Sequence, residues 1–168
     1  MNETNGVFFA PIQQLMNEHV SLRVAMNLFY ELAEEIEYES GPTVIHNFTK
    51  LYESISDFTK NLKAHSKRED EGLFPMMSRH LGENDKTIEM MEFEHEKAEQ
   101  HLKDFLLEAK EISENINEEH AQIISVYAVQ AYTTLIEHFA KEEKILFPLA
   151  EKLLTNEEKE VLAKMFRT

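Results

Sequence analysis

This chain contains two near-copies of one segment, HSKREDEGLFP at residues 65–75 and HFAKEEKILFP at residues 138–148. Each copy reads as a histidine, three residues, a glutamate, four residues and then Phe-Pro. Residues four apart lie on the same face of an α-helix, so each copy places a histidine beside a carboxylate one turn away. Metal ligands use this spacing, and here it occurs twice.

Two more histidines extend the duplication over most of the chain. His19 precedes His65 by 46 positions, and His95 precedes His138 by 43, so the second half repeats the first almost in register. Two helical hairpins related by a pseudo-two-fold axis would bring one set of side chains together inside a bundle. The set comprises four imidazoles and two carboxylates: His19, His65, Glu69, His95, His138 and Glu142.

Composition favours a single domain over residues 1–168 that is rich in long helices. The hydrophobic content of 42% is enough for one continuous core, and four Gly and four Pro leave few break points. The net charge of -15 should repel nucleic-acid phosphates and anionic membranes, so neither is expected as a partner. The chain shows no membrane span and no signal peptide, which predicts a cytoplasmic location.

The apolar periodicity predicts an all-α fold. Connections this short imply antiparallel neighbours, hence an up-down-up-down four-helix bundle with a short C-terminal fifth helix. Thr155 and Glu158 form a capping box for the fifth helix. The prolines after Glu69 and Glu142 should kink or end the helix just beyond each glutamate. The predicted helices span about 11–39, 43–70, 85–115 and 117–153, with the short one at about 156–166.

The predicted ligand set suits two metal ions. Each ion would take two histidines, while Glu69 and Glu142 reach across and bridge the pair. Asp70 and Glu143 compete for the bridging role, but the four-residue spacing from histidine favours Glu69 and Glu142. Nitrogen and oxygen ligation without cysteine suits iron, manganese or zinc, and is too nitrogen-rich for calcium or magnesium. Glu99 shares a helix face with His95 and is a further candidate ligand.

Four stretches carry a resemblance to a known family: PIQQLMNEHVSLR, HSKREDEGLFP, FEHEKAEQH and HFAKEEKILFP. They resemble the hemerythrin-like, or HHE cation-binding, family over essentially the whole chain. The resemblance implies a four-helix bundle around two iron ions, an oxo- or hydroxo-bridged di-iron centre that meets O2, NO or peroxide. It also implies the six ligands named above.

The chain departs from the oxygen carriers of that family at two places. The carriers have a second histidine four residues after the one on the third helix, where this chain has Glu99. They also use HxxxxD on the fourth helix, where this chain has Glu142 at the four-residue spacing. Four histidines and two glutamates resemble more closely the metal domain of repair-of-iron-centres proteins, which are linked to recovery from nitrosative and oxidative damage.

The favoured hypothesis is therefore a non-haem di-iron protein that handles a diatomic or peroxide species, in stress response, iron-centre repair or sensing. It would depend on a separate electron donor or signalling partner, and its oligomeric state is left open. The alternatives are a reversible O2-binding or storage protein, a ferritin-like iron oxidase and a metal-free structural or adaptor bundle. Four tyrosines are candidates to hydrogen-bond a bound oxygen species: Tyr30, Tyr52, Tyr127 and Tyr132.

Overall fold

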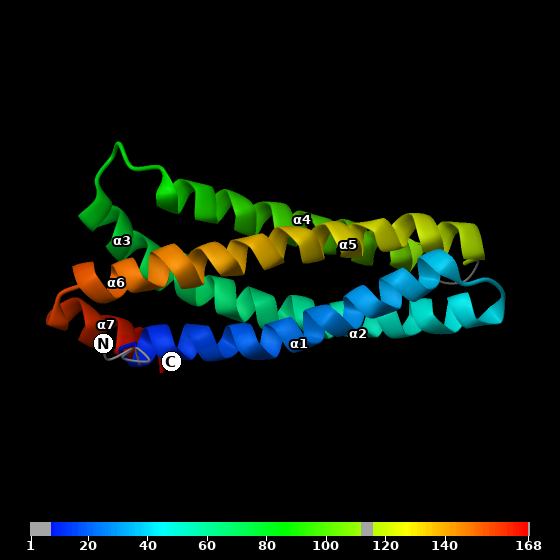
Figure 1. The fold of residues 1–168 in the computed structure, drawn as a ribbon, viewed down its shortest axis with the longest axis horizontal. Coiled ribbons are helices and arrows are strands. Elements are labelled where there is room, and N and C mark those ends of the chain that lie inside the picture. The colour runs from blue at the N-terminus through cyan, green and yellow to red at the C-terminus, as the bar shows by residue number, and fades with distance from the viewer. Residues whose placement is uncertain (1–7, 112–115, 168) are drawn as a thin grey trace, which may run out of the picture.

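The computed structural model describes residues 8–111 and 116–167, and this part of the chain is helical with no strand. Four long helices run alternately up and down the bundle, and a short helix lies beside the start of the first (Figure 1). The fold is thus the predicted all-α antiparallel four-helix bundle with a short C-terminal helix. The long helices are α1 (Ala10–Tyr38), α2 (Pro42–Arg68), α4 (Thr87–Glu111) and α5 (Glu118–Lys141), and the last helix is α7 (Asn156–Phe166). The predicted end of the third helix, 112–115, lies outside the described residues.

The helix ends follow local signals in the sequence. Pro11 lies in the first turn of α1, where its missing N–H leaves no gap in the ladder. Gly41 precedes α2 with a φ of 84°, a conformation that an L side chain disfavours. The side chain of Asn117 accepts a hydrogen bond from His120 N and caps α5. At α7 the capping box of Thr155 and Glu158 is present as predicted.

A π-helical turn begins at the glutamate of each HxxxE pair. These turns are η1 (Glu69–Leu73) and η2 (Glu142–Leu146). The helix does not end at either π turn. It continues as α3 (Phe74–Leu81) after η1 and as α6 (Phe147–Leu153) after η2, each with a proline in its first turn. The wider π turn supplies the break that proline requires, because proline lacks the N–H and clashes with the carbonyl four residues back. Proline therefore changes the helix locally without ending it.

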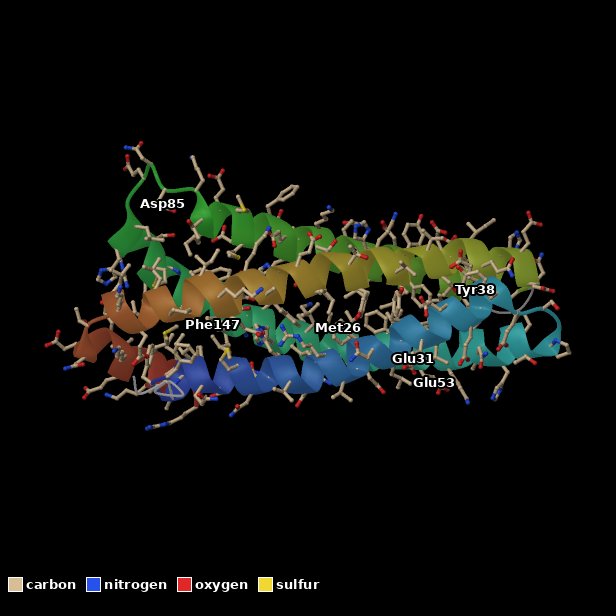
Figure 2. The ribbon with its side chains drawn as sticks, in the orientation of Figure 1. Met26, Glu31, Tyr38, Glu53, Asp85 and Phe147 are labelled. Atoms are coloured by element: carbon tan, nitrogen blue, oxygen red, sulfur yellow. The ribbon has the colours of Figure 1, made fainter. Side chains whose placement is uncertain are left out.

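The interior contains two apolar clusters with a polar layer between them. Met26 and Phe147 lie between the helices, one in each cluster, whereas Tyr38 and Glu53 point outward (Figure 2). On each long helix the predicted metal-binding residues fall at the boundary. On α1, for example, His19 lies between Leu15 of one cluster and Leu22 of the other. Large side chains of the two clusters are fully or almost fully buried, among them Met26, Phe29, Phe58, Met91, Phe105, Phe139 and Phe147.

Helix α7 covers one π turn and leaves the other open. A Cβ on Gly72, in η1, would lie 2.9 Å from Leu162 Cδ1, so α7 packs directly on this glycine. The corresponding residue of η2, Ile145, is 55% exposed. The C-terminal helix thus breaks the two-fold likeness of the two halves. Within the described residues, no helix has the length and apolar character needed to cross a membrane.

Candidate metal centre

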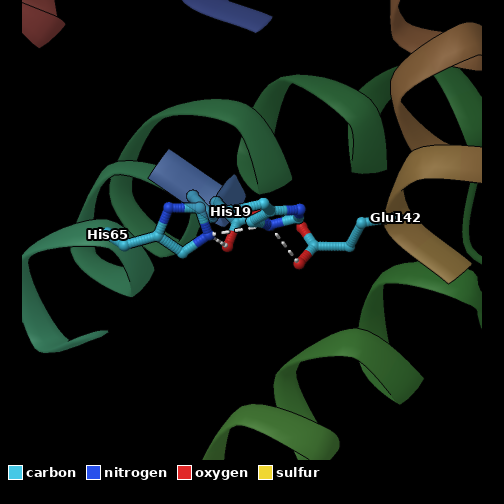
Figure 3. A group of neighbouring side chains, drawn as sticks. His19, His65 and Glu142 are labelled. Atoms are coloured by element: carbon cyan, nitrogen blue, oxygen red, sulfur yellow. Dashed lines mark hydrogen bonds and ion pairs between the residues drawn. The ribbon is translucent and has the colours of Figure 1, made fainter. Parts of the chain in front are cut away.

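Six buried side chains meet in the polar layer, and they are the six that the sequence predicts. Each HxxxE pair stays together on its own helix, with His65 Nε2 3.0 Å from Glu69 Oε1 and His138 Nε2 2.8 Å from Glu142 Oε1. Across the bundle, His95 Nε2 lies 3.4 Å from Glu69 Oε1 and His19 Nε2 lies 3.6 Å from Glu142 Oε1. Figure 3 shows His19, His65 and Glu142 converging from three helices.

The six residues divide into two overlapping groups of four. One group is His19, His65, Glu69 and Glu142, and the other is His95, His138, Glu69 and Glu142. Within each group the ligand atoms lie within 4.8 Å of one another. Each group therefore has two histidines of its own and shares both glutamates with the other, which is the arrangement expected for two metal positions bridged by carboxylates.

The buried polar atoms support a metal ion at this place. Both carboxylate oxygens of Glu69 and of Glu142, together with Nε2 of His95 and of His138, are buried without a hydrogen-bond partner. The close approaches between them lack hydrogen-bond geometry. Buried polar atoms without partners are costly, so they are rare unless something else satisfies them. A cation ligated by nitrogen and oxygen would satisfy all of these atoms at once.

A second carboxylate holds each histidine from its outer side. His65 Nδ1 lies 2.8 Å from Glu18 Oε1, and His95 Nδ1 lies 3.0 Å from Asp70 Oδ1. In the other half, His138 Nδ1 lies 3.0 Å from Glu94 Oε2, and His19 Nδ1 lies 2.7 Å from Glu143 Oε2. An ionised carboxylate only accepts, so each Nδ1–H donates, and each Nε2 faces the centre, where the neutral form of the imidazole could ligate a metal ion.

These outer bonds close a ring around the bundle. Helix α1 supplies a carboxylate to the histidine of α2, the start of η1 supplies one to α4, α4 supplies one to α5, and η2 supplies one to α1. The sequence does not assign these partners. The only available signal was adjacency, since each outer carboxylate directly precedes a histidine ligand or directly follows a glutamate ligand. Asp70 and Glu143, which competed for the bridging role, serve here instead.

Three of the four outer carboxylates also pair with a cation. Arg68 Nη2 lies 2.7 Å from Glu18, Lys141 Nζ lies 2.7 Å from Glu94, and Arg23 Nη1 lies 2.7 Å from Glu143. Glu99 follows His95 by four residues, as Arg23 follows His19. The counterpart of Asp70 in the other half is Glu143, which pairs with Arg23. At the position that corresponds to Arg23, the histidine partner of Asp70 is followed by the acidic Glu99.

The structure does not bring Glu99 into either group of ligands. Its side chain is exposed on α4, and it is absent from the buried cluster. Partial burial of its carboxyl group and the charge of Asp70 raise the pKa of Glu99, while the charge of His95 opposes this shift. The candidate role of Glu99 as a ligand thus has no geometric support.

Two of the outer carboxylates, Glu18 and Glu94, have lowered pKa values. Partial burial opposes the charge of Glu18, but hydrogen bonds from His65 and Arg68 outweigh it and bring its pKa to about 2. The hydrogen bond from His138, against desolvation, brings the pKa of Glu94 to about 2 as well. Both groups remain charged throughout the neutral range and keep Nδ1 of their histidines protonated.

The four histidines fall into two kinds. Burial opposes the charged form of His65 and His95, yet Glu69 and an outer carboxylate outweigh it and raise both pKa values to about 9. Burial prevails at His19 and His138 and lowers their pKa values. Each group of ligands thus contains one histidine of each kind. Without metal, two protonated histidines offset the two buried carboxylates.

Aromatic rings close the layer on both sides. Phe139 stacks on His19 with a centroid distance of 4.0 Å, and Phe74 stacks on His95 at 5.3 Å. The tyrosines proposed as hydrogen-bond donors lie elsewhere: three pack on the apolar cluster that contains Met26, and Tyr30 stacks on one of these, Tyr132. The centre is therefore walled by phenylalanine.

Replacing Glu94 with alanine should weaken metal binding about 10- to 100-fold, because His138 loses the partner that orients its ring. The measurement is a competition titration with a chelator of known affinity. Glu92→Ala is the matched control, since Glu92 is an exposed carboxylate on the same helix. Equal weakening in both variants would show that Glu94 acts only through overall charge.

Comparison with known proteins identifies one family. The model of the hemerythrin HHE cation binding domain matches residues 10–150, from the start of α1 into α6. Searches of curated proteins and of solved structures returned no match. The matched range includes all six residues of the metal centre and excludes α7.

Proposed function

Because this chain belongs to the hemerythrin HHE cation-binding family, we propose that it is a non-haem di-iron protein that binds or reacts with O2, NO or peroxide. Its role would lie in oxidative or nitrosative stress response, iron-centre repair or sensing, with a separate protein as electron donor or signalling partner. The observation that carries this proposal is the pair of ligand groups that share Glu69 and Glu142.

The residues of the centre divide the work between them. Glu69 and Glu142 belong to both groups and would help to hold both metal ions, and each of the four histidines would supply its Nε2. The outer carboxylates fix the ring orientations, and the phenylalanines restrict the entry of water. When bound, a pair of irons supplies redox chemistry and open positions for a small ligand. Two histidines and two shared carboxylates for each ion would leave such positions free.

Two alternatives lose support from particular residues. A ferritin-like oxidase uses ExxH on two helices, but the single such pair here includes Glu92, whose side chain is exposed on α4. A metal-free bundle would leave the carboxylates of Glu69 and Glu142 buried with no hydrogen-bond partner. Reversible O2 storage stays an alternative, because it requires the same centre.

Stopped-flow spectroscopy separates these functions. The iron-loaded, reduced protein is mixed under anaerobic conditions with O2, NO or peroxide, and its optical spectrum is followed. We expect a spectral change with at least one of the three, and no such change in a Glu142→Gln variant. Full reversal on removal of O2 would favour storage. No change with any of the three would contradict the proposal.

A further inference from the structure

One buried hydroxyl in the polar layer has no partner. Ser66, next to His65, is 2% exposed, and its Oγ makes no hydrogen bond. Among the described residues, every other buried side-chain atom in this condition belongs to a predicted metal ligand. Ser66, adjacent in the chain to the predicted ligand His65, thus shares with those ligands a buried polar atom that has no partner.

Other helical hydroxyls in this protein behave differently. Ser125 Oγ donates to Ala121 O at 2.7 Å, and Thr59 Oγ1 donates to Ile55 O at 2.7 Å. Both follow the usual bond of a helical serine or threonine to the carbonyl four residues back. Ser66 lies in an equally regular part of α2 and does not make this bond. Its hydroxyl is thus left available for another partner.

The helix register directs Ser66 toward His95. Glu69 and Asp70 follow Ser66 by three and four residues, so the three share a face of the helix. Both of these acidic residues approach the ring of His95, at 3.4 Å and 3.0 Å. Ser66 is therefore on the face of α2 that adjoins the metal position of His95 and His138.

The other half of the chain has a different residue at the position equivalent to Ser66. In the second half the residue after the HxxxE histidine is Phe139, which is fully buried and stacks on His19. Glu142 and Glu143 follow Phe139 as Glu69 and Asp70 follow Ser66, and both approach His19. Each of these two histidines has a phenylalanine from the Phe-Pro segment beside it, Phe147 at His19 and Phe74 at His95. His19 has a second phenylalanine, Phe139, and the position that corresponds to Phe139 in the other half holds the small hydroxyl side chain of Ser66.

From this asymmetry we propose that the exogenous ligand binds at the metal position of His95 and His138, and that Ser66 Oγ–H donates a hydrogen bond to it. The inference rests on the proposed di-iron function and adds to it the side of binding and the chemical class of ligand. That class is a small molecule or anion with a hydrogen-bond acceptor atom. In the other half the ring of Phe139, stacked on His19, takes the place of this hydroxyl.

The test uses the full chain loaded with ferric iron and titrated with azide, a small anionic probe. The dissociation constant of azide is measured from its optical band in wild type, Ser66→Ala, Ser66→Thr and Ser125→Ala. Loss of one hydrogen bond to an anion should raise the constant about tenfold in Ser66→Ala. Threonine retains the hydroxyl and should restore affinity, and the buried serine control should match wild type.

A vibrational measurement reports the hydrogen bond itself. The azide stretch in wild type should shift on exchange into D2O, and this shift should disappear in Ser66→Ala. Iron content, measured on every variant, distinguishes the two proposals. If two irons are retained and azide binding is the same with and without the Ser66 hydroxyl, this inference is wrong and the proposed function stands. If wild type retains no iron, both are wrong.

Discussion

Glu69→Gln should lower the iron content of the protein from two ions per chain toward zero. Glu69 belongs to both groups of ligands, so its replacement affects both metal positions, whereas each histidine belongs to one group. A neutral amide has a single oxygen and cannot bridge two cations as a carboxylate does. Iron per chain is measured by elemental analysis after loading, with circular dichroism to verify that the variant is folded.

The matched control for this prediction is Glu99→Gln. Glu99 carries the same side chain but is exposed and lies outside the cluster, so this variant should retain two irons. His19→Ala should give an intermediate result, since the second group stays intact. A folded Glu69→Gln protein that still holds two irons would rule out the bridging role of Glu69.

Removal of the metal should lower the melting temperature by about 10 °C or more. A ligand that binds only the folded state at a thousand times its dissociation constant adds about 4 kcal/mol, and 1 kcal/mol corresponds to roughly 2–4 °C for a chain of this size. The layer concerned is fully inside the bundle, where Glu69 and Glu142 are both 0% exposed. Thermal unfolding of metal-loaded and chelator-treated protein measures the difference, which should be abolished in Glu69→Gln.

The direction of the pH dependence follows from the histidines. In the metal-free protein His65 and His95 have pKa values of about 9, above the unfolded value of 6.5. The stability that their protonation provides is complete below 6.5 and is lost as the pH rises through 9. A metal ion binds the neutral imidazole, so binding becomes tighter over the same range. The gain in melting temperature should therefore increase from pH 6.5 to pH 8, and a decrease would contradict this assignment.

The sequence was most informative where a pattern repeats. Helix periodicity and the shortage of break points predicted the bundle, and the duplicated HxxxE spacing, together with the repeated placement of His19 and His95, predicted which six side chains would converge. The preference for Glu69 over Asp70 came from face-sharing alone, and the structure places Glu69 inside and Asp70 outside. That the six residues bind metal stays a prediction.

The features that sequence reasoning missed depend on packing between helices. Glu18 is adjacent to His19 but bonds His65 on another helix, so adjacency in the chain gave no indication of its partner. The π turns before Pro75 and Pro148 are defined by their backbone hydrogen bonds. Over five residues, the spacing of apolar residues does not distinguish a π turn from an α turn. Glu99 shares a face with His95, but its neighbour Ala98 takes the buried position and Glu99 remains exposed.

We propose that two metal ions lie between the four helices and share Glu69 and Glu142. Anomalous diffraction at the iron edge, from crystals of protein purified from its native host, would locate bound iron. We expect two iron peaks per chain, one beside His19 and His65, the other beside His95 and His138, with both glutamates between them. A single peak, no peak, or iron ligated by Asp70 or Glu143 in place of the shared glutamates would contradict it.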